Sequence, residues 1–154
     1  MEKYYTLAPI TILIVEDNKD DIRLVKEALK GEKTIANLVS IEDGEKAMEY
    51  LRKEGKFIDA ETPDLILLDL NLPKKDGLEV LSEIKNDDKL KLIPVIIMTI
   101  SNEERDIFTS YNLHANAYII KPLKYNQFIE AIRSLENFWF TIVKLPPKLD
   151  TEGK

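Results

Sequence analysis

The sequence predicts an α/β fold in which a doubly wound parallel sheet carries helices on both faces. The clearest sign is the run Leu-Ile-Leu-Leu at residues 65–68, because a strand without polar positions is typical of a sheet buried on both faces. Four further apolar runs alternate with five amphipathic segments, as in repeated βα units. The length of 154 residues fits one domain, whereas a closed eight-unit barrel would need ~100 more residues.

The five predicted strands are short and rich in aliphatic and β-branched residues. They cover residues 10–15, 35–39, 65–68, 94–98 and 117–120. Helices are predicted over residues 19–30, 44–53, 78–85, 102–112 and 125–140. Right-handed crossovers between parallel strands then favour the flavodoxin-like strand order 2-1-3-4-5.

The helix boundaries follow from capping residues and apolar spacing. Asn18 is the expected N-cap of the first helix, with Asp20 and Asp21 in its first turn, where the helix dipole favours anions. Gly31 is the expected stop of this helix. In the first three helices the side chains expected to face the sheet are Ile22, Val25, Leu29, Ala47, Met48, Leu51, Leu78, Val80, Leu81 and Ile84.

We expect one domain over residues 10–140, preceded by a lead-in at residues 1–9 and followed by a tail at residues 141–154. The tail is too short for a DNA-binding or catalytic output domain. The output is therefore expected to be an interaction surface for another protein.

Composition excludes several classes of function. The chain is 44% hydrophobic and 32% charged, with no cysteine, no apolar run of membrane-spanning length and no signal-peptide pattern. The net charge of −6 argues against nucleic-acid binding. We therefore expect a cytoplasmic protein that binds neither membrane nor nucleic acid.

Polar residues follow the predicted strands where neighbouring strands end. Glu16 and Asp17 follow the first strand, Asp69 the third, Thr99 the fourth and Lys121 the fifth. In the predicted order these ends meet at one edge of the sheet. Carboxylates at close range repel unless they are protonated or bridged by a cation, and oxygen ligands of this kind suit Mg²⁺.

This group of residues fits phosphoryl transfer. Asp69 can attack phosphorus and form an acyl phosphate, while Mg²⁺ and Lys121 neutralise phosphoryl oxygens and Thr99 donates a hydroxyl hydrogen bond. Each residue alone also has an ordinary explanation, such as a turn for Asp69 or a solvated charge for Lys121. Their joint position at consecutive strand ends favours the chemical interpretation.

Several motifs resemble the receiver domain of two-component response regulators, over about residues 10–136. The matching motifs are Val15-Glu16-Asp17-Asn18, Leu68-Asp69-Leu70-Asn71-Leu72-Pro73 with Gly77, Met98-Thr99, and Tyr118-Ile119-Ile120-Lys121-Pro122. The resemblance implies a signalling protein that catalyses only its own phosphorylation and dephosphorylation, with a sensor histidine kinase as its partner.

The resemblance also implies a role for each site residue. Asp69 would be the phospho-acceptor, and Asp17, Asp69 and the backbone carbonyl of Asn71 would bind Mg²⁺ directly. Glu16 would act through a metal-bound water. Lys121 would stabilise the phosphoryl group, while Thr99 and Tyr118 would form the coupled switch, although Tyr118 could also be an ordinary aromatic residue of a strand.

Two positions are unusual for this family. Ile100 stands where a small residue is common after the switch threonine, and its bulk is expected to restrict access to the site. His114, the single histidine, could carry a phosphate. The favoured interpretation is a helix-ending residue with positive φ, a conformation in which His is enriched.

The end of the last helix carries more aromatic residues than one buried stripe requires. A heptad-like seam runs through Phe128, Ile132, Leu135, Trp139 and Ile142. Phe138, Trp139 and Phe140 are consecutive, so they cannot all face one side of a helix, and part of this group is expected to form a dimer or partner surface. The tail at residues 138–147 and the stretch at residues 64–73 are similar to small single-domain regulators that partner bacterial phytochrome-type kinases, and this similarity implies a homodimer.

Two other functions stay open at this point. The first is a phosphohydrolase with Asp69 as nucleophile, but such enzymes often place a general-acid Asp two residues later, where this chain has Asn71. The second is a binding module that keeps the fold without phosphorylation.

Overall fold

A computed structural model describes residues 10–30 and 36–148 of the chain. Its strands are β1 (Ile10–Val15), β2 (Ala36–Ile41), β3 (Leu65–Leu68), β4 (Val95–Thr99) and β5 (Ala117–Ile120). They form one parallel sheet in the order β2-β1-β3-β4-β5. The predicted fold class and strand order are confirmed.

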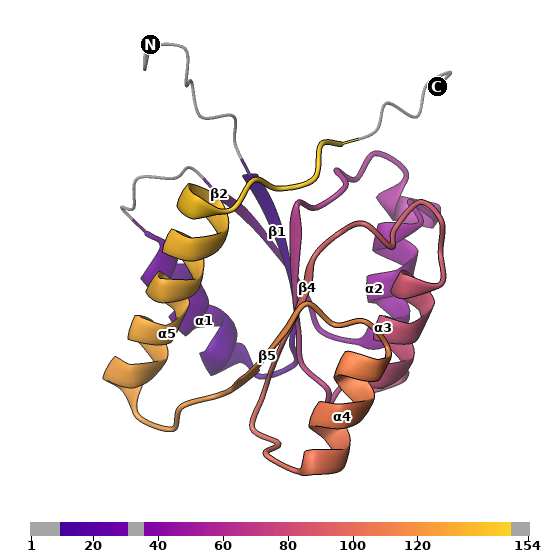
Figure 1. The fold of residues 1–154 in the computed structure, drawn as a ribbon. Coiled ribbons are helices and arrows are strands. Elements are labelled where there is room, and N and C mark those ends of the chain that lie inside the picture. The colour runs from indigo at the N-terminus through magenta and orange to yellow at the C-terminus, as the bar shows by residue number, and fades with distance from the viewer. Residues whose placement is uncertain (1–9, 31–35, 149–154) are drawn as a thin grey trace, which may run out of the picture.

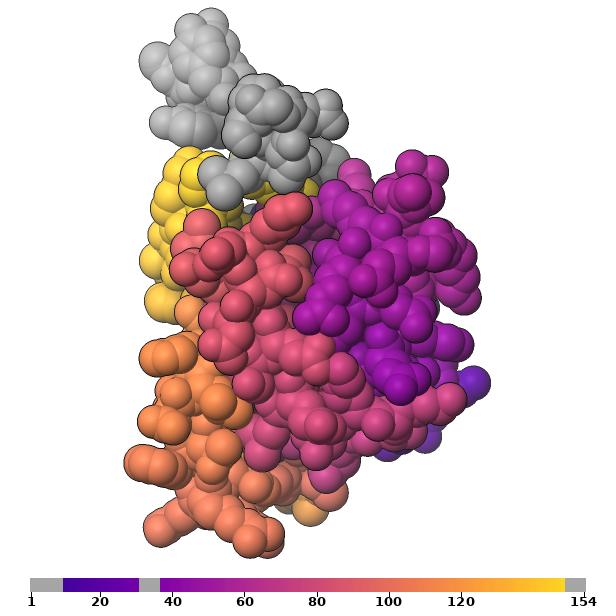
Figure 2. All heavy atoms as spheres, turned by 90° about the vertical axis from the view of Figure 1, so that its right-hand side faces the viewer, coloured from indigo at the N-terminus to yellow at the C-terminus, as the bar shows by residue number. Residues whose placement is uncertain are grey.

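The helices cover both faces of the sheet (Figure 1). One face carries α1 (Lys19–Leu29) and α5 (Tyr125–Asn137), which pack side by side. The other face carries α2 (Gly44–Leu51), α3 (Gly77–Lys85) and α4 (Glu104–Asn112), with a short 3₁₀ helix, η2 (Gly55–Phe57), after α2. Figure 2 shows this second face, where the side chains of α2, α3 and α4 close over the sheet.

The core is divided by the sheet into two apolar layers. Successive strand residues point to opposite faces, so Leu13 and Ile66 lie in the layer under α2 and α3, whereas Ile12 and Leu65 lie in the layer under α1 and α5. All four side chains are at most 1% exposed. Central strands covered on both faces explain why the run at residues 65–68 contains no polar residue.

Most of the expected helix ends are confirmed. Asn18 caps α1 by accepting a hydrogen bond from the Asp21 N–H at 3.0 Å. His114 has a φ of 73° directly after α4, which fits its interpretation as a helix-ending residue. The expected inward stripes are largely buried, with Leu29 and Leu78 only half-buried.

Some boundaries differ from the prediction. β2 extends to Ile41 because it pairs with β1 over six consecutive positions, whereas the pattern predicted residues 35–39. Ile35, Gly31 and the lead-in at residues 1–9 lie outside the described residues. The predicted start of the fourth helix at Asn102 is wrong, because the Ser101 hydroxyl accepts from the Glu103 N–H at 3.3 Å and the helix begins at Glu104.

The predicted α-helix over residues 125–140 is also too long. It ends at Asn137 and continues as a π-helical turn, η3 (Phe138–Ile142). The wider turn breaks the heptad-like seam, because Ile142 is 66% exposed whereas Trp139 packs against the core under α1 and α5. Phe140 packs against the same layer, and Phe138 is half exposed.

After η3 the chain crosses the end of the sheet at which the strands begin (Figure 1). The Lys148 ammonium lies 3.6 Å from the carboxylate of Asp64, which precedes β3. Asp64 also accepts a hydrogen bond from the Thr11 N–H at 2.9 Å, so it joins this segment to β1. Pro146 and Pro147 border a hollow of about 960 Å³ beside Pro63 and Leu90. No helix among residues 10–30 and 36–148 is long and apolar enough to span a membrane.

Candidate phosphoryl-transfer site

Backbone hydrogen bonds continue past the strand ends and fix the positions of the site residues. The Asp69 N–H donates to the Val15 carbonyl at 3.1 Å, which holds Asp69 beside the end of β1. The backbone N–H of Lys121 donates to the Thr99 carbonyl at 2.7 Å, which holds Lys121 beside the end of β4. The predicted convergence at the carboxyl edge of the sheet is therefore present in the backbone itself.

The Lys121 ammonium lies among three carboxylates. Its Nζ is 2.7 Å from Glu16 Oε1, 2.8 Å from Asp21 Oδ2 and 3.1 Å from Asp69 Oδ2. An ammonium has three N–H donors, and these contacts provide one acceptor for each. The Lys121, Glu16 and Asp69 side chains are at most 7% exposed, and the Asp21 side chain is 19% exposed.

Asp17 adds a further, exposed carboxylate to this edge. Glu16, Asp17 and Asp69 each offer one oxygen within 4.8 Å of the other two. A set of oxygen donors without nitrogen or sulfur fits a hard divalent cation. Among the described residues negative charge also exceeds positive charge here, since the single ammonium of Lys121 contacts the carboxylates of Glu16, Asp21 and Asp69. The residues therefore fit a bound divalent metal.

Burial raises the pKa of Glu16 to about 7, and the nearby charge of Asp69 acts in the same direction. The ammonium of Lys121 and the N–H of Asn18, which donates to Glu16 Oε2 at 3.1 Å, oppose this rise. For Lys121, burial lowers the pKa, but hydrogen bonds to Asp21 and Glu16, together with the negative charges of Asp69 and Glu16, outweigh burial and raise it. Lys121 is therefore a permanent cation of the site.

The residues after Asp69 are held by two close backbone approaches. A Cβ at Gly77 would lie 2.2 Å from the Asp69 carbonyl oxygen, and a Cβ at Gly44 would lie 1.9 Å from the Lys75 carbonyl oxygen. Only glycine fits at either contact. Asp69 Oδ1 accepts a hydrogen bond from the Asn71 N–H at 3.2 Å, which orients the carboxylate.

Thr99 and Tyr118 both contact Ser101. The fully buried Thr99 accepts a long hydrogen bond of 3.5 Å from the Ser101 N–H at its hydroxyl, and the Tyr118 hydroxyl donates to the Ser101 carbonyl at 3.0 Å. The Ser101 hydroxyl in turn donates to Asp106 in α4 at 2.6 Å. Burial, with the nearby charges of Asp106 and Asp69, raises the pKa of Tyr118.

Large apolar side chains are exposed on the elements next to Thr99 and Tyr118 in the chain. Ile100, next to Thr99, is 62% exposed. Other large apolar residues exposed on α4, β5 and the loop after β5 are Phe108, Tyr111, Ile120 and Leu123.

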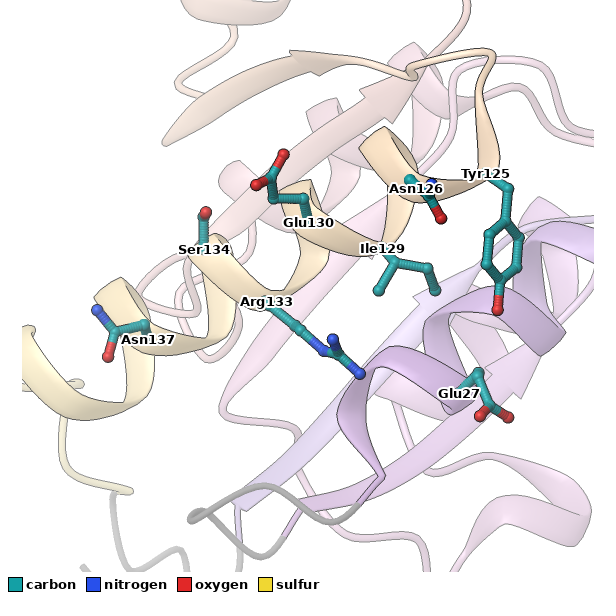
Figure 3. Close-up of a pocket in the computed structure, with 8 residues that line it drawn as sticks. All are labelled: Glu27, Tyr125, Asn126, Ile129, Glu130, Arg133, Ser134 and Asn137. Atoms are coloured by element: carbon teal, nitrogen blue, oxygen red, sulfur yellow. The ribbon is translucent and has the colours of Figure 1, made fainter.

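A separate groove of about 690 Å³ lies between α1 and α5 (Figure 3). Arg133 reaches across it from α5, and its Nε donates to the Ala28 carbonyl of α1 at 3.4 Å. None of the residues that line this groove belongs to the carboxylate cluster.

The fold and the site geometry agree with the comparison to known proteins. A model of the response regulator receiver domain matches residues 12–133. The chain belongs to this family. The receiver is 46% identical to the response regulator Rcp1 of Synechocystis, over 90% of its own chain and 94% of that protein.

Two solved structures are close to this receiver. The phosphorylated cyanobacterial phytochrome response regulator RcpA is 51% identical, with a TM-score of 0.89 over 91% of this chain and 100% of that chain. The Mn²⁺-bound form of Rcp1 is 45% identical, with a TM-score of 0.88 over 90% of this chain and 100% of that chain.

The structure brings most of the residues that the sequence singled out to one edge of the receiver. Glu16, Asp17, Asp69 and Lys121 are in one cluster. Phe138, Trp139 and Phe140 lie at the opposite end of α5, which is about 20 Å long at 1.5 Å per residue.

Sequence reasoning missed Asp21 and Ser101. Asp21 lies in the first turn of α1, and its charge there was already explained by the helix dipole. The available signal was its place in the first turn of α1, directly after the acidic residues that follow β1. Ser101 had no signal of its own, because its contacts with Tyr118 and Thr99 depend on how β4 and β5 are paired.

Proposed function

We propose that this receiver is a single-domain response regulator in which Asp69 accepts a phosphoryl group from a sensor histidine kinase. The observation that carries the proposal is the buried Asp69 carboxylate, held 3.1 Å from Lys121 inside an acidic cluster. A structural turn residue would not need a buried ammonium and two further carboxylates around it.

The transfer uses Asp69 as the nucleophile. One carboxylate oxygen forms a bond to phosphorus while the bond between phosphorus and the kinase imidazole nitrogen breaks. The nitrogen keeps the electron pair and takes a proton from solvent, and the product is an acyl phosphate on Asp69. Lys121 is positioned to neutralise one oxygen of the transferred group.

The metal is proposed to be Mg²⁺, held by Asp17, Asp69 and the Asn71 carbonyl, with Glu16 acting through a bound water. Such an ion neutralises charge on the phosphoryl oxygens. The Mn²⁺-bound form of Rcp1, which is 45% identical, supports a divalent cation in this receiver.

We propose that Thr99 and Tyr118 transmit phosphorylation through Ser101. Turning the Thr99 hydroxyl toward the phosphoryl group breaks its contact with the Ser101 N–H. Ser101 also holds the Tyr118 hydroxyl and Asp106, so its displacement changes the surface formed by α4 and β5. The exposed apolar residues on this surface fit a protein partner.

The output is proposed to be protein interaction, because large apolar side chains are exposed near the end of α5 and on α4 and β5. The half-exposed Phe138, with Trp139 and Phe140 beside it, is proposed as a homodimer or downstream-partner surface. Similarity to the cyanobacterial phytochrome regulator RcpA supports a phytochrome-type kinase as the phosphate donor in the cytoplasm.

The experiment that tests this function is intact mass after incubation with Mg²⁺ and acetyl phosphate, on the wild type and Asp69→Asn. We expect one added phosphate on the wild type and none on the variant. Continued release of phosphate over many turnovers would instead favour a phosphohydrolase. Absence of labelling and of turnover would favour the binding module.

A further inference from the structure

Asp21 is not among the receiver residues that the proposed function uses, yet it makes one of the shortest contacts of the site. Its Oδ2 lies 2.8 Å from Lys121 Nζ, compared with 3.1 Å for Asp69. Asp20, one residue earlier in the same turn of α1, has a 76% exposed side chain and pairs with Arg23. Asp20 is therefore exposed to solvent whereas Asp21 contacts Lys121, although the helix dipole acts on both carboxylates.

The three contacts of Lys121 are unequal in what they can do during phosphoryl transfer. The bond to Asp69 lies where the phosphoryl group is added, so this N–H is the one that can turn to a phosphoryl oxygen. Glu16 belongs to the acidic cluster that fits the metal. Asp21 is outside that cluster, so its carboxylate is free to hold Lys121 in both states of Asp69.

We propose that Asp21 is a positioning residue that anchors the Lys121 ammonium beside Asp69, so that the third N–H is directed at the incoming phosphoryl group. This inference rests on the proposed function, because it concerns the same transfer. Without Asp21, one N–H of Lys121 loses its acceptor, and the long, flexible lysine side chain is held by fewer contacts.

The test compares the rate of Asp69 labelling by acetyl phosphate in the wild type, Asp21→Ala and Asp21→Asn, with Asp20→Ala as the matched control. We expect Asp21→Ala to label roughly tenfold more slowly, because a misplaced group in a transfer site commonly costs one to two orders of magnitude. Asp21→Asn keeps an acceptor oxygen in the same place and should regain most of the rate. Asp20→Ala should label like the wild type.

A second measurement detects the hydrogen-bonded ammonium of Lys121 directly, in metal-free protein. An ammonium held by hydrogen bonds exchanges its protons slowly enough for NMR detection of the ¹⁵N-labelled lysine. We expect a Lys121 ammonium signal in the wild type and in Asp20→Ala, its loss in Asp21→Ala, and its recovery in Asp21→Asn.

The outcomes separate this inference from the proposed function. If the wild type is not labelled at Asp69, the proposed function fails. If the wild type is labelled but Asp21→Ala labels equally fast, or keeps the Lys121 signal, Asp21 does not position the Lys121 ammonium. Faster labelling of both Asp21 variants would also overturn it, because Asp21 would then act as a repelling charge.

Discussion

Replacing Gly77 with Ala should disturb both the stability of the receiver and the position of its proposed phospho-acceptor. The new Cβ would lie 2.2 Å from the Asp69 carbonyl oxygen and 2.5 Å from the Leu70 Cα. Ordinary contact begins at 3.4 Å, so the two chain segments must separate by the difference between 3.4 and 2.2 Å, which is 1.2 Å. Neither clashing atom can rotate away, because both belong to the backbone.

The expected cost is about 3 kcal/mol of unfolding free energy, at the upper end of what overpacking usually costs. Urea unfolding measures it as a lower midpoint with an unchanged slope. Labelling by acetyl phosphate should also slow, because the displaced backbone carries Asp69. Gly55→Ala is the control: its φ of 57° makes the substitution strained by about 1–2 kcal/mol, but no atom lies within 4 Å of the new Cβ. Equal losses for both variants, with normal labelling by Gly77→Ala, would refute the close-approach argument.

Four further predictions concern the site and the interaction surfaces. Lys121→Met should cost about 3–5 kcal/mol of unfolding free energy, because buried carboxylates lose their cation, and added Mg²⁺ should restore part of it in thermal melts. Because burial raises the pKa of folded Tyr118 above the ordinary 10.0, the unfolded chain loses its proton first, so stability should fall more steeply above pH 10 in the wild type than in Tyr118→Phe. Ile100→Ala should speed labelling by small phosphodonors, and an unchanged rate would show that the exposed Ile100 does not restrict access. Phe138→Ser should lower the mass measured by light scattering from dimer to monomer if the half-exposed Phe138 lies in the dimer surface, and a monomeric wild type would contradict the homodimer.

The sequence was most informative where a feature depends on residues close together in the chain. The aliphatic run at residues 65–68 identified β3, and polar residues after four of the five strands predicted the cluster around Asp69, because parallel strands end at the same edge. Side-chain caps such as Asn18 were also predictable, since the cap and its partner are three residues apart.

The sequence was least informative where two distant elements meet. Asp21 and Lys121 are 100 residues apart, and their contact depends on how α1 and β5 sit relative to each other. The π-helical turn after Asn137 was not predictable from apolar spacing, because the pattern at residues 128–139 continues a regular α-helix. The extent of β2 was set by its pairing with β1.

The segment that ends near Asp64 offers a place from which this protein can be observed without blocking the acidic cluster. Lys148 lies at the edge of the sheet where the strands begin, whereas Asp69 follows the end of β3. A strand of four to six residues separates these edges by about 13–20 Å. Because the chain has no cysteine, Lys148→Cys would provide a single attachment point for a dye or a sensor surface. A receiver immobilised in this way would present its proposed phosphorylation edge freely to a kinase in solution.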